Sequence, residues 1–155
     1  MTWTLEGLFE LRTVGELLKK LEFDYDRLRH SSVDTYIAFD FFVTAEHMLD
    51  WQYPGKANEA RRAQEKQSEV LLQICSHIAN GFKHFKVEAA RHRSVTNSKV
   101  EGGAFDPSAF QNDAFDVGRL VVDLDGDAAV KYGPDIEVTD LAGKILSFWK
   151  SKIGP

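Results

Sequence analysis

The sequence predicts a mainly α-helical protein, a bundle of four or five helices that carries a small C-terminal β-hairpin. Apolar residues recur at helical spacing over most of positions 5–90 and again after position 139. Residues that can cap helices precede several of these runs. A β-branched run followed by an Asp-Gly pair occurs near position 120, and this combination is typical of a hairpin.

The sequence of the first half of the chain predicts an N-terminal helical region and a central buried helix. Apolar residues at helical spacing between positions 5 and 29 indicate one interrupted helix or two short ones, and Thr13 with Glu16 forms a capping box for the second run. Ser31 and Asp34 form a similar box ahead of residues 36–43, which are apolar on almost every side. We therefore expect a central helix that reaches about Trp51.

The longest expected helix follows the break at Pro54-Gly55. It begins near Asn58 or Glu59, is polar in its first half, and reaches about Ala90. Its second half carries one apolar stripe, made of Leu71, Ile74, Ile78, Phe82 and Phe85.

The last third of the chain predicts a loop, a hairpin and a final helix. Residues 92–118 lack clear periodicity, which indicates a loop. Residues 120–132 are expected to form the hairpin, with Asp125-Gly126 at its turn, and Thr139 is expected to cap the last helix. The organisation is thus one domain over 1–155, with the bundle at about 5–90, the loop at about 92–118, and the hairpin and last helix at about 119–153.

Composition limits the function classes. The chain of 155 residues is 43% hydrophobic and 28% charged, which fits one globular domain. A net charge of -5 argues against a general electrostatic grip on nucleic acid. The candidates for a local basic patch are Arg61-Arg62, then Lys83, Lys86, Arg91 and Arg93, and the alternative is that these residues form a solvated helix face. One cysteine, Cys75, excludes an intrachain disulfide, and no membrane-spanning segment or secretion signal is evident. We expect a cytoplasmic protein that makes no membrane contact.

A seam of amide, imidazole and acidic side chains lies beside the apolar stripe on the helical wheel: Gln73, His77, Asn80, His84 and Glu88. Such groups suit a partly buried seam with specific hydrogen bonds, and a purely structural seam is the simplest interpretation. Asp40, among aromatic residues on the preceding helix, needs a partner: His77, His84, an arginine or a backbone amide. Structural pairing and the orienting of a catalytic histidine are both open interpretations.

Residues Ala79-Asn80-Gly81-Phe82-Lys83-His84 resemble the active-site segment of the HEPN superfamily, helical bundles that include metal-independent ribonucleases. The family motif is an arginine, a polar residue that is commonly asparagine, three further residues and a histidine. Asn80 and His84 match this motif, whereas Ala79 stands in place of the arginine. The resemblance implies that Lys83, Arg91 or a residue of a second subunit supplies the positive charge, or that the chain is a degenerate, non-cleaving member.

The site that the resemblance implies has His84 and Asn80 as catalytic residues. His84 would be the general acid or base, since its ordinary pKa is near neutrality, and Asn80 would position the phosphate or the histidine. The candidate substrate-binding residues are His77, Lys83, Arg91 and Asp40. A metal site built from Asp40, His47, His77 and His84 is disfavoured, because His77 and His84 would lie about 10.5 Å apart along a helix.

The functional expectation is therefore an RNA-directed HEPN-like protein in a defence or toxin-antitoxin setting, either a weak metal-independent ribonuclease or a degenerate binding member. We expect no metal and no cofactor. The partners expected are RNA and either a second copy or another protein. The alternative is a non-enzymatic interaction or regulatory domain in which the polar seam is structural.

Overall fold

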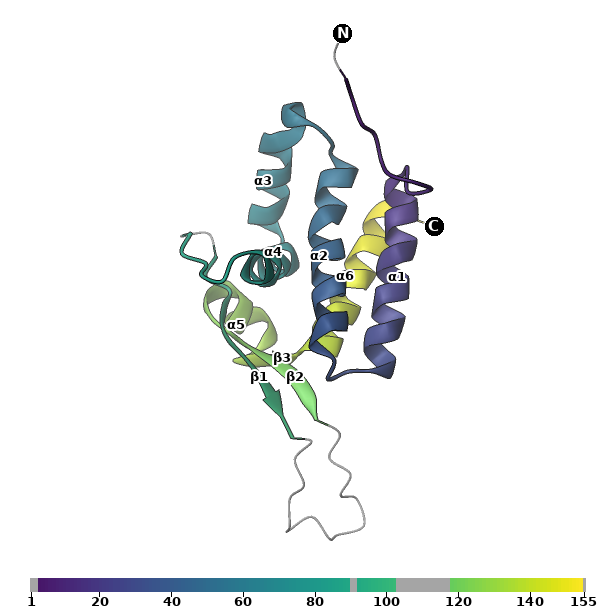
Figure 1. The fold of residues 1–155 in the computed structure, drawn as a ribbon. Helices are drawn as coiled ribbons and strands as arrows, with labels where there is room; N and C mark the ends of the chain where they lie inside the picture. Colours follow the sequence, from purple (N-terminus) through teal and green to yellow (C-terminus); the bar gives the residue numbers. More distant parts are fainter. Residues whose placement is uncertain (1–2, 90–91, 103–117, 155) are drawn as a thin grey trace.

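The computed structural model describes residues 3–89, 92–102 and 118–154. Three helices, α1 (Val14–His30), α2 (Thr35–Gln52) and α6 (Val138–Ile153), stand side by side, and α4 (Val70–Lys83) crosses α2 and is seen nearly end-on in Figure 1. A small sheet and α5 (Gly126–Tyr132) lie beside α4, on the side of the bundle away from α1. The predicted mainly helical class is confirmed.

Capping residues set the starts of α1 and α2. The Thr13 hydroxyl accepts from the Glu16 N–H at 3.2 Å, and the Glu16 carboxylate accepts from the Thr13 N–H, so the predicted capping box is present. Asp34 caps α2 by accepting from two N–H groups of its first turn. The helical expectation for residues 5–9 is wrong: they precede α1 in non-helical backbone, because the cap at Thr13 fixes where the helix begins.

The single long helix expected over about 58–90 is also wrong. A 3-10 turn, η1 (Lys56–Asn58), leads into α3 (Glu59–Ser68), and the backbone is extended at Glu69 before α4 starts. The Glu69 carboxylate accepts from the Leu71 N–H at 3.0 Å and so serves as the cap of α4. Helix α4 ends at Lys83, seven residues before the expected end. This break lets the polar α3 and the apolar α4 take different directions.

The sheet has three antiparallel strands in the order β1-β2-β3, with β1 at Val95–Glu101, β2 at Arg119–Leu124 and β3 at Asp135–Glu137. The expected hairpin over 120–132 is wrong in its second half. Asp125 is the extended N-cap residue of α5, and its side chain accepts from the Gly126 N–H at 2.8 Å. The partners of β2 are instead β3, which follows α5, and β1, which lies inside the segment expected to be loop. Residues 103–117 of that segment lie outside the described residues.

One core joins these elements. Its most deeply buried side chains include Leu21 of α1, Phe41 and Phe42 of α2, Ile74 of α4 and Trp149 of α6. Residues of β2 and β3 complete the core from the sheet side. The described part of the chain has six α-helices, whereas four or five were expected. The number is higher because the expected long helix is split into α3 and α4, and because α5 forms where a strand was expected.

Helix α6 begins at Val138, and its N-cap residue is Glu137, which makes no side-chain capping bond. The expectation that Thr139 caps this helix is therefore wrong: Thr139 already lies within its first turn, and its hydroxyl is buried with no hydrogen-bond partner among the described residues. None of the described helices has the length and apolar character to cross a bilayer.

Candidate functional site

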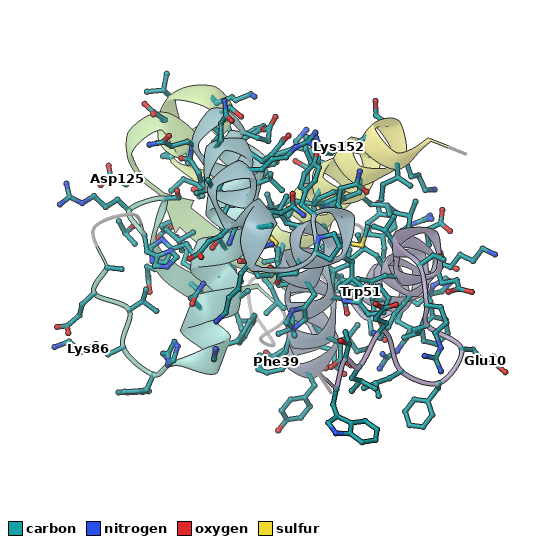
Figure 2. All side chains as sticks on the ribbon, turned by 90° about the horizontal axis from the view of Figure 1, so that it is seen from above. Glu10, Phe39, Trp51, Lys86, Asp125 and Lys152 are labelled. Atoms are coloured by element: carbon teal, nitrogen blue, oxygen red, sulfur yellow. The ribbon has the colours of Figure 1, made fainter. Side chains whose placement is uncertain are left out.

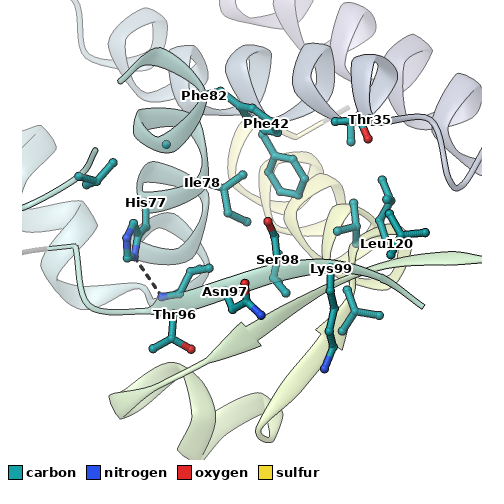
Figure 3. A pocket seen from close by; sticks show the side chains of 18 of the residues that line it. Thr35, Phe42, His77, Ile78, Phe82, Thr96, Asn97, Ser98, Lys99 and Leu120 are labelled. Atoms are coloured by element: carbon teal, nitrogen blue, oxygen red, sulfur yellow. Dashed lines mark hydrogen bonds between the residues drawn. The ribbon is translucent and has the colours of Figure 1, made fainter. Parts of the chain in front are cut away.

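A pocket of about 580 Å³ lies between the N-terminal half of α2, the C-terminal half of α4 and strands β1 and β2 of the sheet. Figure 3 shows α4 and α2 on one side and strand β1 on the other, with the Ser98 side chain directed toward Ile78 and Phe42. Most lining groups are apolar, with a few polar ones. A volume and lining of this kind are typical of a ligand-binding pocket.

His77 is the one sequence-predicted site residue that lines this pocket. Its Nδ1 accepts a hydrogen bond of 3.0 Å from the backbone N–H of Val95, the first residue of β1, and its ring lies 5.4 Å from that of His92. Nδ1 is therefore unprotonated, and the neutral ring carries its proton on Nε2. Burial lowers the pKa of His77 below its ordinary value of 6.5. The residue is thus a neutral link between α4 and the sheet.

The two candidate catalytic residues do not line the pocket. The Asn80 amide donates to the Ser76 carbonyl one turn earlier in α4 at 2.8 Å, so its N–H group is already used within its own helix. His84 is the C-cap residue of α4 in extended backbone, with an exposed side chain. The seam that the helical wheel predicted is consequently divided, because α4 ends at Lys83 and His84 no longer lies on the helical face that holds Asn80.

The neighbours of Asn80 and His84 in the chain include a buried alanine and exposed basic residues. Ala79 is buried at the position of the family arginine. Among the described residues, no carboxylate forms an ion pair or hydrogen bond with His84 that would orient its ring. Lys83 is exposed on the last turn of α4, and Arg91 lies outside the described residues. Lys83, His84 and Lys86 are all exposed, and Lys86 forms an ion pair with Glu88 at 2.7 Å.

Asp40 pairs with Arg27 of α1, and an arginine was one of the partners expected for it. Its Oδ2 accepts from Arg27 at 3.2 Å, and its side chain is 46% exposed, so it neither lines the pocket nor meets His77 or His84. His47 is exposed and lies 3.8 Å from Asp50. In the described ranges, no three His, Cys, Asp or Glu side chains gather where they could hold a metal ion.

Sequence reasoning missed most of the pocket wall. The residues it did not single out include Thr35, Phe42, Gly81, Ser98 and Leu120. Gly81 carries a signal that was available: it stands inside an apolar helical stripe, where glycine is unfavourable. A Cβ built there meets nothing within 4 Å, so close packing within the chain does not explain the glycine. Ser98 left no such signal, because the segment that forms β1 lacks a clear period.

Aromatic side chains border the pocket at the ends of α2 and α4. The Phe39 and Phe82 rings lie 4.7 Å apart, and Phe39 sits at the outer edge of α2 in Figure 2. Tyr36 is 85% exposed, and Phe85, which lines the pocket, is fully exposed. Exposed aromatic groups beside an apolar pocket are typical of a surface that binds a partner.

Comparison with protein-family models, with curated proteins and with solved structures finds no match for this chain.

Proposed function

We propose that this chain is a non-enzymatic binding domain that accepts apolar side chains of a partner in the pocket between α2, α4 and the sheet. The observation that carries the proposal is the apolar pocket of about 580 Å³ with exposed aromatic residues at its border. Burial of apolar surface contributes about 25 cal/mol per Å², so filling this pocket is a substantial driving force. The polar seam of α4 is then structural, with His77 and Asn80 bound to the backbone.

The geometry supports binding over catalysis. Asn80 is committed to Ser76, and Ala79 is buried where the family arginine would act. His84 does not line the pocket, so Asn80, His84 and the pocket do not form one site. A catalytic centre needs a nucleophile or base, a charge stabiliser and a substrate space within hydrogen-bond reach of one another.

The test uses 8-anilinonaphthalene-1-sulfonate, a fluorescent probe with an apolar aromatic ring system and one sulfonate group, with the protein at submicromolar concentration. The wild type is expected to bind one probe per chain. Gly81→Leu, which adds a side chain at the open pocket wall, is expected to weaken binding by about tenfold or more. Ala63→Leu adds the same side chain on exposed α3, away from the pocket, and is expected to leave probe binding unchanged. Equal binding by the wild type and Gly81→Leu would contradict the proposal.

A second candidate function is RNA-directed, as the HEPN resemblance implies. The observation that favours it is the exposed imidazole of His84 between Lys83 and Lys86, which are also exposed. An open imidazole beside two ammonium groups could approach a phosphate backbone. Purified protein incubated with single-stranded RNA, with and without chelator, distinguishes the two proposals. Chelator-resistant cleavage that His84→Ala abolishes would establish the ribonuclease, whereas intact RNA in every reaction supports the binding domain.

A further inference from the structure

Residues 3–12, which precede α1, form a bent segment held by hydrogen bonds, and we call this segment the hook. The Arg12 guanidinium donates to the Phe9 carbonyl at 2.9 Å and to the Glu6 carbonyl at 2.7 Å. Leu8 and Leu11 exchange backbone hydrogen bonds of 3.1 and 2.9 Å. These bonds close residues 6–12 into a compact turn fixed to the start of α1.

The hook displays large apolar side chains to solvent. Trp3 is 92% exposed, Leu5 78%, Leu8 54% and Phe9 88%. Among the described residues, Phe9 is the one non-glycine residue with a positive φ, 55°. A residue with a Cβ adopts this conformation at a cost, and the arrangement turns the phenyl ring outward instead of into the core. The hook therefore holds an apolar group in a fixed, exposed position.

The pocket of the same chain is out of reach of the hook. Arg12 holds residues 6–9 at the start of α1, so three residues, 3–5, extend freely, and these span at most about 10 Å. The pocket begins at Thr35, beyond the far end of α1, whose 17 residues span about 25 Å. Helix α4 also packs on α2 and not beside α1, and each helix pair adds a spacing of about 8–10 Å. Figure 1 shows the hook and α4 on opposite sides of the bundle.

The hook and the pocket border carry complementary charge. Glu6 and Glu10 are exposed on the hook and form no ion pair among the described residues. Residues 81–87 contribute Gly81, Phe82, Phe85 and Val87 to the pocket wall. Lys83 lies between them in the sequence, is exposed and forms no ion pair among the described residues, whereas Lys86 pairs with Glu88 at 2.7 Å. The carboxylates of Glu6 and Glu10 are therefore opposite in charge to Lys83 beside the pocket wall, which favours contact between the two surfaces.

We propose that the hook of one copy inserts Trp3 and Phe9 into the α2–α4–sheet pocket of a second copy, and that reciprocal insertion makes a two-fold dimer. The inference rests on the proposed binding function and names its partner. Each aromatic side chain buries about 150–250 Å². Two reciprocal insertions therefore bury on the order of 1,600 Å² over both surfaces, the size of a standard stable interface.

The test is sedimentation velocity on the full chain and two variants. The wild type is expected at 35 kDa, twice the 17.5 kDa of one chain. The double variant Trp3→Ser/Phe9→Ser loses the insert but not the pocket, and Gly81→Leu obstructs the pocket but keeps the hook; each alone is expected at 17.5 kDa. Their mixture is expected to recover a heterodimer through its one intact pair. Unchanged thermal unfolding of each variant monomer shows that folding is preserved.

A wild type that is monomeric at its highest soluble concentration, or a dimer that both variants leave intact, would overturn the inference. Probe binding is measured in Trp3→Ser/Phe9→Ser, because no copy of this variant has a hook side chain that could fill the pocket of another copy. If this variant binds the fluorescent probe in its pocket but not a synthetic peptide of residues 3–12, the second copy is the wrong partner and the binding function stands. If substitution at Gly81 leaves probe binding in that background unaffected, the binding function itself fails.

Discussion

Asp24 ties α1 to α2 from within the core. Its side chain is fully buried, and its Oδ2 accepts from Thr44 at 3.0 Å and from Lys20 at 2.5 Å. The residue lies three positions after Leu21 and four before Leu28, on the apolar face of α1. A carboxylate at such a position needs donors, because an unpaired buried charge is very unfavourable. The spacing was visible in the sequence, but the donor from α2 was not.

We predict that Thr44→Val destabilises the fold by about 1–2 kcal/mol, since it removes a donor to a buried carboxylate and keeps the side-chain shape. The matched control is Thr139→Val. The Thr139 hydroxyl is buried with no partner among the described residues, so its removal should be neutral or slightly stabilising. Urea unfolding of the two variants measures both effects, and equal destabilisation would contradict the prediction.

His77 makes the junction between α4 and β1 sensitive to pH. Its folded-state pKa is lowered by burial, so its contribution to stability is fully present above the unfolded value of about 6.5 and is lost as the pH falls through the lowered folded value. Protonation converts Nδ1 from acceptor to donor and breaks its bond with the Val95 N–H. We predict that this loss is about 1 kcal/mol, the net worth of one such hydrogen bond.

The measurement is thermal unfolding of the wild type and His77→Gln across this pH range. Glutamine can keep an acceptor near Val95 but does not titrate, so the difference between the proteins isolates the histidine. His47→Gln, at an exposed histidine, is the control and should track the wild type. A His77→Gln protein that loses the same stability on acidification would show that other groups are responsible.

At the scale of elements, two helical glycines have opposite roles. Gly81 of α4 faces open space at the pocket, whereas a Cβ at Gly143 of α6 would come within 2.8 Å of the Tyr25 hydroxyl oxygen of α1. Glycine at position 143 therefore allows α6 and α1 to approach closely. Glycine at position 81 serves no packing purpose within the chain.

We predict that Gly81→Ala stabilises the protein by about 0.5–1 kcal/mol, because alanine favours the helix and nothing obstructs its methyl group. Gly143→Ala is expected to destabilise it by about 1 kcal/mol or more, since the Tyr25 ring must move. The midpoints of urea unfolding at constant slope give both values. Destabilisation by Gly81→Ala would mean that the space above Gly81 is filled in solution.

At the scale of the whole molecule, helix α6 brings distant segments into one core. Trp149 is fully buried and belongs to the same cluster as Leu21 of α1, Phe42 of α2 and Ile74 of α4. Trp149 thus packs in one cluster with residues that lie 75 to 128 positions earlier in the sequence. Loss of its anchor should weaken every element together.

We predict that Trp149→Ala destabilises the fold by about 3–5 kcal/mol through the cavity that it leaves. Phe148→Ala, at the half-buried neighbour whose ring contacts Trp149, is the control and should cost clearly less. Far-UV circular dichroism and near-UV absorbance should show one coincident transition in urea, as expected for a single cooperative unit. Separate transitions would show that α6 and the sheet unfold apart from the bundle.

The sequence by itself determined the helical class, the cap of α1 and the central buried α2. These features depend on local capping and on apolar period, both of which neighbouring residues encode. The end of α4 was overestimated, because residues past Lys83 continue the period but have no helix to pack against. His84 thereby left the face that Asn80 occupies.

Only the tertiary structure decided the sheet and the pocket. Strand β1 lacks a clear period, and its place is set by pairing with β2, which begins 18 residues after β1 ends, and by the bond from Val95 to His77. Asp-Gly served as a helix cap instead of a turn for the same reason: the partner of β2 comes from elsewhere. The pocket lies where three distant segments meet, and long-range contacts of this kind leave no pattern in any one of them.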